Sequence, residues 1–260
     1  MKTPCSLAIL AVAATALALA AVAGCTHTAK TTPAQVTAVL NDGTRPEADT
    51  KRDADRKPAD MVAFAGIKAG DKVVDFIPAS GYFTRVFSRV VGATGTVYAF
   101  VPQEMLDKRA TAADAVKAIA AEPAYKNVQV VVLPAPGFVV PAPVDVVWTS
   151  QNYHDMHNAS FGIPDYAAVN KAFFKALKPG GVYIVLDHAA TAGSGSADTQ
   201  KLHRIDPAVV KSEVVAAGFV FEGESTVLRN PADPHTAMVF DPGLRGKTDQ
   251  FIYKFRKPAH

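Results

Sequence analysis

Histidines and carboxylates gather in two short stretches of the 260-residue chain. The sequence QNYHDMH, residues 151–157, follows one apolar run, and Asp187 and His188 end another. Histidine titrates near neutral pH and suits proton transfer to or from a reacting group, and a neighbouring carboxylate can orient it. We therefore predict His154 as a general base, with His188 as the second candidate. Asp155 or Asp187 would be the orienting carboxylate.

Further polar side chains could hold a substrate beside this base. They lie in the same stretch or in the later sequence LHRID, residues 202–206. An arginine can bind a carboxylate or a phosphate through two hydrogen bonds. The predicted substrate-binding residues are Tyr153, His157, His203 and Arg204. Asp206 has a simpler interpretation, because it precedes Pro207 and fits a helix N-cap with proline at the first helical position.

The same part of the sequence contains residue types that bind metal ions. Imidazole and carboxylate groups are common ligands of zinc and other transition metals. Their spacing matches no known ligand motif, so the sequence assigns no metal ligand, and metal binding stays an alternative. The residues concerned are His154, His157, His188, His203 and Asp187.

Strands that alternate with helices must position these groups. Apolar runs predict strands over 72–76, 96–101, 128–133, 144–149, 182–187, 219–227 and 250–256. Helical spacing of apolar residues predicts helices over 47–66, 82–91, 103–121, 166–177 and 207–217. Strands that are nearly all apolar favour a mainly parallel sheet covered on both faces. The last two strands have no helix between them and predict an antiparallel pair. Ligands of such sheets bind at the carboxyl ends of the strands, where both polar stretches fall.

This order of elements resembles the class I S-adenosylmethionine (SAM) methyltransferase fold. The resemblance covers residues 60–257 and implies an α/β, doubly wound, mostly parallel seven-stranded sheet of the Rossmann-like type with an antiparallel last strand. FFKALKPGGVYIVLDH, residues 173–188, is its most specific piece and resembles the helix, turn and fifth strand. The other pieces are GIKAGDKVVDF (66–76), VGATGTVYAF (91–100) and PVDVVWTSQNYHDMH (143–157).

A narrower resemblance points to a bacterial group of exported predicted methyltransferases. That group is named from its fold, and its substrate is not established. The resemblance implies SAM as the cofactor and methyl transfer to a small molecule that the sequence does not identify. It rests on DRKPADMVAFAGIKAGDKV, HRIDPAVVKSEVVAAGFVFEGES, RNPADPHTAMVFDP and RGKTDQFIYKFRKP.

The stretch VVDFIPASG, residues 73–81, resembles the cofactor loop of class I methyltransferases, with departures. The resemblance places an acid near the ammonium group of SAM at Asp75, and the loop's alternate glycines at Ile77, Ala79 and Gly81. A β-branched Ile77 should exclude φ > 0, and the following proline should favour an extended backbone there. The predicted cofactor-binding residues are Asp75, Ile77, Pro78, Ala79, Gly81, Phe100, Gln151 and Asn152.

The second strand lacks the acid that usually bonds the ribose hydroxyls in this superfamily. Gln103 or Glu104, just beyond the strand, could replace it. Phe100 has two equally weighted interpretations, as an adenine-stacking residue or as part of the core. The altered loop and the missing acid leave an alternative function open. It is a catalytically inactive methyltransferase-fold protein that binds a small molecule or a metal in the cell envelope.

The N-terminus predicts export. A positive Lys2 followed by apolar and small residues over 6–23 is typical of a signal peptide. Residues 22–25, VAGC, resemble the lipobox of bacterial lipoproteins, which predicts a signal peptide over 1–24 and lipidation at Cys25. The protein would then be periplasmic and reach the membrane only through its lipid anchor. Simple secretion and an uncleaved anchor are the alternatives. A polar tether over 25–45 would precede the methyltransferase-like domain, 46–260.

Composition excludes other classes of protein. The chain is 49% hydrophobic and 20% charged, which is sufficient for one good-sized core, and its formal charge of +3 gives no basis for nucleic-acid binding. Cys5, the one other cysteine, lies in the predicted signal, so no disulfide and no cysteine metal site is expected. Lys51, Arg52, Arg56 and Lys57 alternate with acids and predict a solvated helix face.

Overall fold

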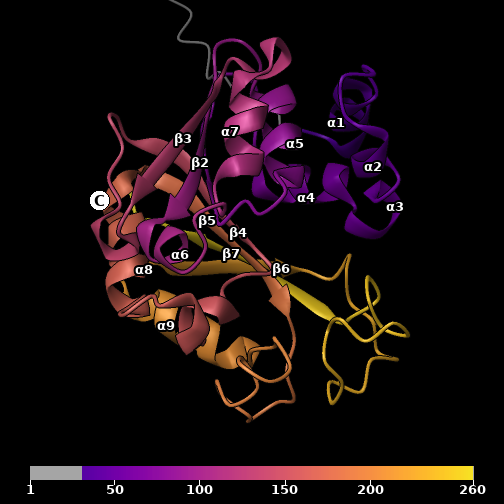
Figure 1. The fold of residues 1–260 in the computed structure, drawn as a ribbon, viewed down its shortest axis with the longest axis vertical. Helices are drawn as coiled ribbons and strands as arrows, with labels where there is room; N and C mark the ends of the chain where they lie inside the picture. Colours follow the sequence, from indigo (N-terminus) through magenta and orange to yellow (C-terminus); the bar gives the residue numbers. More distant parts are fainter. Residues whose placement is uncertain (1–30, 260) are drawn as a thin grey trace, which may run out of the picture.

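The computed structural model describes residues 31–259 (Figure 1). The predicted signal peptide, residues 1–24, and Cys25 lie outside this range and stay predictions. Among the helices of the described range, none has both the length and the apolar character that a membrane span requires.

Seven strands form one sheet in the order β3-β2-β1-β4-β5-β7-β6. Strand β7 pairs antiparallel with both β5 and β6, and the other pairs are parallel. This confirms the predicted doubly wound, mostly parallel sheet with an antiparallel last strand. The order reverses between β1 and β4, and such a switch point opens a crevice for ligands. The strands are β1 Lys72–Phe76, β2 Thr96–Pro102, β3 Val128–Leu133, β4 Val144–Ser150, β5 Leu177–His188, β6 Val220–Ser225 and β7 Gln250–Arg256.

Helices cover both faces of the sheet (Figure 1). Helices α4 (Pro58–Ala65), α5 (Tyr82–Val91) and α7 (Asp114–Ala121) pack on one face, and α8 (Tyr166–Ala176) and α9 (Pro207–Ala216) on the other. Successive side chains of a strand point to opposite faces, so the neighbours Val73 and Val74 belong to different cores. Both are fully buried, which explains why this strand is apolar without alternation.

Two of the predicted helices are divided in the structure. Residues 47–66 form α2 (Glu47–Thr50), α3 (Asp53–Arg56) and α4, because Lys57 adopts φ 46° before Pro58 and interrupts the helix. Residues 103–121 form α6 (Gln103–Lys108) and α7, with a turn between them. Four short 3₁₀ helices complete the fold: η1 Pro123–Tyr125, η2 Ala135–Gly137, η3 His154–His157 and η4 Ala159–Phe161.

The prediction of a polar tether over residues 25–45 is wrong for part of its length. Residues Pro33–Leu40 form helix α1, which begins with a capping box between Thr32 and Gln35. Val36 and Leu40, one helical turn apart, are buried where α1 packs against α4 and α5. The folded domain therefore begins earlier than the polar composition of this segment indicates.

Candidate functional site

A cavity of about 570 Å³ opens at the carboxyl ends of β1, β2 and β4, within the size range of small-molecule sites. Its wall comes from the loops after β1 and β4, from α3 and α6, and from the late loop that carries Phe240. The strand order reverses at this point of the sheet, where a ligand is expected. Among the predicted cofactor-binding residues, Asp75, Ile77, Pro78, Ala79, Gln151 and Asn152 line the cavity.

The loop after β1 has positive φ at the three positions where the resemblance places glycines, although only one of them is a glycine. Ile77, Ala79 and Gly81 adopt φ values of 53°, 50° and 79°. The expectation that Ile77 excludes φ > 0 is therefore wrong. Its conformation is held from both sides, because Ile77 N–H donates to Phe100 O at 2.9 Å and the Asn152 side-chain amide donates to Ile77 O at 3.1 Å. Residues in this region cost about 1–3 kcal/mol each and cluster at ligand sites.

Ala79→Gly is expected to raise the free energy of unfolding by about 0.5–1 kcal/mol. Ala79 is exposed, so the change removes the strain of φ 50° and little packing, and the entropy of the unfolded glycine offsets part of the gain. Urea unfolding measures it. Ala93→Gly is the matched control, an exposed turn alanine without positive φ, and it should destabilise slightly. If Ala79→Gly and Ala93→Gly changed the free energy of unfolding equally, the backbone of Ala79 would not be strained.

Gly81 positions the loop without lining the cavity. It precedes α5 with φ 79°, a value that favours glycine, and a Cβ added to it would lie 2.1 Å from Ile119 Cδ1, so the Ile119 side chain on α7 would have to shift. Of the three positions where the resemblance places glycines, Gly81 is therefore the one where packing against α7 favours glycine, and it is the one that is a glycine.

Asp75 is the buried carboxylate of the β1 loop. The Thr84 hydroxyl donates to its Oδ2 at 2.6 Å. Burial raises the pKa of Asp75 to about 7, against the opposing effects of the Thr84 hydrogen bond and the charge of Arg56. A cationic group bound in the cavity would therefore favour the ionised form of this carboxylate.

The loop after β4 presents polar atoms that lack a partner. Within residues 31–259, Ser150 Oγ and Asn152 Oδ1 are buried and make no hydrogen bond, and both residues line the cavity. Asp155 Oδ1 also makes no hydrogen bond of good geometry in this range, but it lies 3.1 Å from His154 Nε2 and pairs with that imidazole when it is protonated. Buried polar atoms are nearly always satisfied in folded proteins, so two unsatisfied oxygens beside one cavity indicate a ligand with hydrogen-bonding groups. The Asn152 amide nitrogen donates instead to Phe76 O and Ile77 O, which ties this loop to the β1 loop.

Arginine and lysine side chains give the cavity a basic wall that was not predicted. The solvated helix face expected for Arg56 is wrong: its guanidinium lies 4.7 Å from the centroid of the Tyr82 ring and donates to Gln151 Oε1. Burial lowers the pKa of Arg56 to about 10, so the group stays charged at neutral pH. The spacing of residues in the sequence does not indicate that α3 contacts the start of α5, so the contact of Arg56 with Tyr82 could not be predicted from it. The other cations of the wall are Arg52, Lys108 and Arg109.

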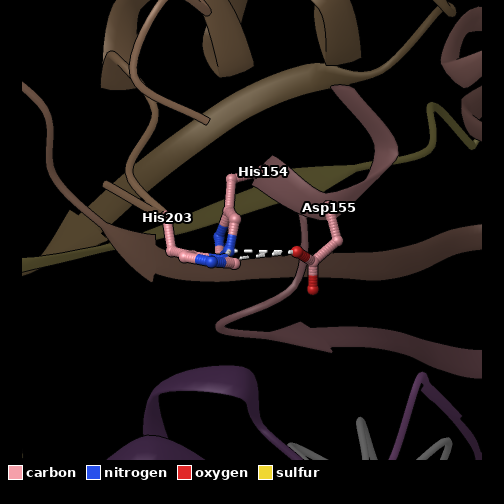
Figure 2. A group of neighbouring side chains, drawn as sticks. All are labelled: His154, Asp155 and His203. Atoms are coloured by element: carbon pink, nitrogen blue, oxygen red, sulfur yellow. Dashed lines mark hydrogen bonds and ion pairs between the residues drawn. The ribbon is translucent and has the colours of Figure 1, made fainter. Parts of the chain in front are cut away.

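The predicted catalytic residues His154 and Asp155 meet in space, together with His203 (Figure 2). Asp187, another of the predicted catalytic residues, contacts His154. His154 Nδ1 lies 2.8 Å from Asp187 Oδ1, and its Nε2 lies 3.3 Å from His203 Nδ1 and 3.1 Å from Asp155 Oδ1. Burial disfavours the charged imidazole, but Asp187 and Asp155 outweigh it and raise the pKa of His154 to about 10. Of these residues Asp155 lines the cavity, and His154 lies behind it, 3.1 Å from its carboxylate.

His188 lies apart from this group. Its Nδ1 is 2.7 Å from the Thr248 hydroxyl, and burial lowers its pKa to about 4. It lines a second cavity of about 430 Å³, which shares Arg52, Arg56 and Gln151 with the first. The two cavities are therefore neighbours, and Arg52 and Arg56 of the basic wall face both.

Three of the predicted substrate-binding residues have structural roles instead. Arg204 is buried in an ion pair with Asp233. The Tyr153 hydroxyl donates to Glu213 Oε2 at 2.8 Å, and His157 Nε2 lies 3.0 Å from the same oxygen. Neither lines the cavity. Helix α9, which carries Glu213, packs behind the loop and engages both polar groups, so the structure gives Tyr153 and His157 a role in packing and no place in the cavity wall.

The structure also places Phe100 and Glu104, the candidate residues of the second strand and of the helix that follows it. Phe100 is fully buried, with its ring centroid 4.4 Å from that of Phe138, so it belongs to the core and not to the cavity. Glu104 accepts from Ala135 N–H and is not part of the cavity wall, so it does not replace the missing ribose acid. Asp206 accepts from Ala208 N–H at 2.9 Å, which confirms its role as the N-cap of α9.

Solved structures with the same fold include several methyltransferases. A SAM-dependent methyltransferase from Aquifex aeolicus is 17% identical with a TM-score of 0.57, over 86% of this chain and 97% of that one. The [4+2]-cyclase SpnF is 16% identical with a TM-score of 0.60, over 86% and 93%. The glycopeptide N-methyltransferase MtfA, complexed with sinefungin, is 14% identical with a TM-score of 0.53, over 78% and 94%.

No protein-family model and no curated protein sequence matches the chain. The structural likeness therefore establishes the class I methyltransferase fold. Because a cyclase shares that fold, the activity must be argued from the site.

Proposed function

We propose that the protein is a SAM-dependent methyltransferase that acts on a small molecule. The observation that carries the proposal is the pair of unpartnered polar atoms, Ser150 Oγ and Asn152 Oδ1, beside Asp75 in a cavity at the switch point of the sheet. The methyltransferases that share this fold support the choice of ligand.

The residues present fit the methionine end of SAM. Its ammonium group offers donors, and Asp75 together with the free oxygen of Asn152 offers acceptors in the loops that meet there. The left-handed backbone of Ile77 and Ala79 keeps the loop in the shape that glycines would give it. The missing glycines therefore do not exclude cofactor binding by themselves.

Asp155 is the carboxylate best placed for chemistry. When bound, SAM supplies a methyl group on a positively charged sulfur, and its transfer to an oxygen or nitrogen leaves a proton to be removed. Asp155 and Asp75 are the carboxylates among the described residues that line the cavity, and Asp75 belongs to the cofactor loop. Asp155 would accept the proton of the acceptor, while Asp187 and His154 hold its loop.

The basic wall favours an anionic acceptor. Arg52 and Arg56 line both cavities, and Arg245 lines the second, against one carboxylate there, Asp55. Arginine binds carboxylate and phosphate groups well. A small acid or phosphate ester that extends into the second cavity fits this charge, whereas the overall charge of the chain gives no support for nucleic acid.

Titration of the full-length protein with SAM in a calorimeter at pH 8 tests the proposal. We expect saturable binding below millimolar SAM. Asp75→Asn should weaken it about tenfold or more, because a hydrogen bond to a charged group contributes about 1.5–3 kcal/mol. Asp107→Asn is the matched control, since Asp107 is exposed on α6 and does not line the cavity.

Two outcomes would contradict the proposal. The first is the absence of heat at millimolar SAM with a folded protein. The second is an equal affinity of the wild type and Asp75→Asn, because the ligand would then bind away from the β1 loop. Unchanged binding by Asp107→Asn shows that the loss is specific to the cavity.

A further inference from the structure

We propose that His154, Asp155 and His203 form a binding site for one divalent transition-metal ion such as Zn²⁺. These three side chains point toward one another from two separate segments of the chain (Figure 2). Two imidazole nitrogens and one carboxylate oxygen form a donor set that such ions favour.

The geometry of the three ligand atoms fits an ion at their centre. His154 Nε2 lies 3.1 Å from Asp155 Oδ1 and 3.3 Å from His203 Nδ1, and the last two atoms are 3.9 Å apart. A triangle with these sides has a circumradius of about 2.0 Å, which is the usual length of a bond from zinc to nitrogen or oxygen. One point is therefore at bonding distance from all three atoms.

An unpartnered atom points to a ligand at this place. Asp155 is 6% exposed, and its Oδ1 makes no hydrogen bond within the described residues although it lies beside two imidazoles. Its 3.1 Å contact with His154 Nε2 is an ion pair only while that nitrogen carries a proton, and a metal ion would replace the proton between the two atoms. The nearby carboxylates Asp155 and Asp187 would balance the charge of a divalent ion.

The surroundings hold the ligands in place. Asp187, fully buried, lies 2.8 Å from His154 Nδ1, which leaves Nε2 as the ligand atom, as in metal sites where a carboxylate orients a histidine. Asp187 is itself fixed by the backbone N–H groups of His154 and His188.

The loop that carries His203 is also anchored. His203 has φ 56°, and the next residue, Arg204, is locked in its buried ion pair. Asp155 lines the cavity, so the ion would be reached from there, and three protein ligands leave at least one coordination position for water or a substrate oxygen.

Cobalt and zinc titrations of the full-length protein, purified without a histidine tag, test the site. We expect one equivalent of Co²⁺ to produce visible d–d absorption bands, and Zn²⁺ to displace it. His203→Ala and Asp155→Asn should each weaken zinc binding at least 100-fold in competition with a chromophoric chelator. Asp187→Asn should weaken it about 10–100-fold, because it removes the carboxylate that orients His154.

His157→Ala is the matched control and should leave the affinity unchanged, since His157 pairs with Glu213 outside the cluster. Circular dichroism confirms that each variant is folded. His203 is partly exposed, so His203→Ala is expected to keep the fold. Absence of saturable binding at millimolar Co²⁺ and Zn²⁺, or binding that His203→Ala and Asp155→Asn leave unchanged, would overturn the inference. The titration contains no SAM, so its failure and the failure of the proposed function are distinguishable.

Discussion

Arg204→Met is expected to lower the free energy of unfolding by about 3–5 kcal/mol, the usual cost of leaving one member of a buried ion pair alone. The Arg204 and Asp233 side chains are fully buried, and two bonds of 2.9 and 3.1 Å join them. Methionine fills a similar volume, so the loss reflects the uncompensated charge of Asp233. Urea unfolding followed by circular dichroism measures it.

The arginine also closes the two long loops of the C-terminal half. Its guanidinium donates to Ala189 O and Ala237 O, and Asp233 accepts from the N–H of Asp249. The variant should therefore be cut by protease in the segments around residues 190–203 and 230–249 before the rest of the chain, because their shared anchor is gone.

An exposed ion pair provides the comparison. Lys51 and Glu47 form a pair across one turn, with both side chains more than 70% exposed, and Lys51→Met should change the stability by less than about 0.5 kcal/mol. If Arg204→Met cost no more than Lys51→Met, the buried pair would not anchor the loops. In that case the fixed position of His203 would need another explanation.

The sheet could be predicted from sequence because its strands are continuous apolar runs. Val73 and Val74 both need burial, and only a sheet covered on two faces supplies it. The boundaries of helices were less predictable. The break at Lys57 comes from one residue with φ 46°, and α1 is stabilised by Val36 and Leu40 in a core made by distant residues.

The site was predictable to the extent that it follows strand ends. Asp75, Asn152 and Asp155 lie where the carboxyl ends of β1 and β4 meet, which topology alone determines. The roles of Tyr153 and His157 were not predictable in this way, because they depend on Glu213 of α9, about sixty residues further on. Polar residues of one short stretch thus divide between the cavity and the packing behind it.

The β1 loop shows why a motif can be judged too strictly. Glycine is usual at positive φ because it has no Cβ, but Ile77 reaches φ 53° with its side chain buried and its backbone bonded to Phe100 and Asn152. Packing and hydrogen bonds stabilise here what local preference disfavours. Positive φ is therefore present at all three positions although two of the three glycines are absent.

The stability of the wild type is expected to fall as the pH rises from about 4 to about 7, and Asp75→Asn is expected to abolish this fall. Burial raises the pKa of Asp75 from 3.8 to about 7 in the folded protein. Between these values the unfolded chain has released the proton and the folded chain still holds it. The folded state binds more protons there, so the stability falls as the pH rises, by up to about 1.4 kcal/mol per pH unit, and is level above pH 7.

Asparagine keeps the shape and still accepts from the Thr84 hydroxyl, but it carries no charge to bury. The stability of Asp75→Asn minus that of the wild type should therefore grow from pH 4 to pH 7 and stay constant above it. Urea unfolding of both proteins at half-unit steps of pH measures this difference, and other titrating groups cancel in it. Asp107→Asn is the control for the substitution itself, because Asp107 is exposed on α6 and does not line the cavity.

A stability difference between Asp75→Asn and the wild type that does not change with pH would contradict this expectation. It would show that the Asp75 carboxylate is ionised over the whole pH range and that burial does not raise its pKa. The expected curve has a further consequence for the cavity. A cationic ligand would favour the ionised carboxylate, so its affinity for the wild type should rise with pH up to about 7, while its affinity for Asp75→Asn should not. The variant that is more stable at pH 8 would then be the weaker binder, which separates a loss of binding from a loss of fold.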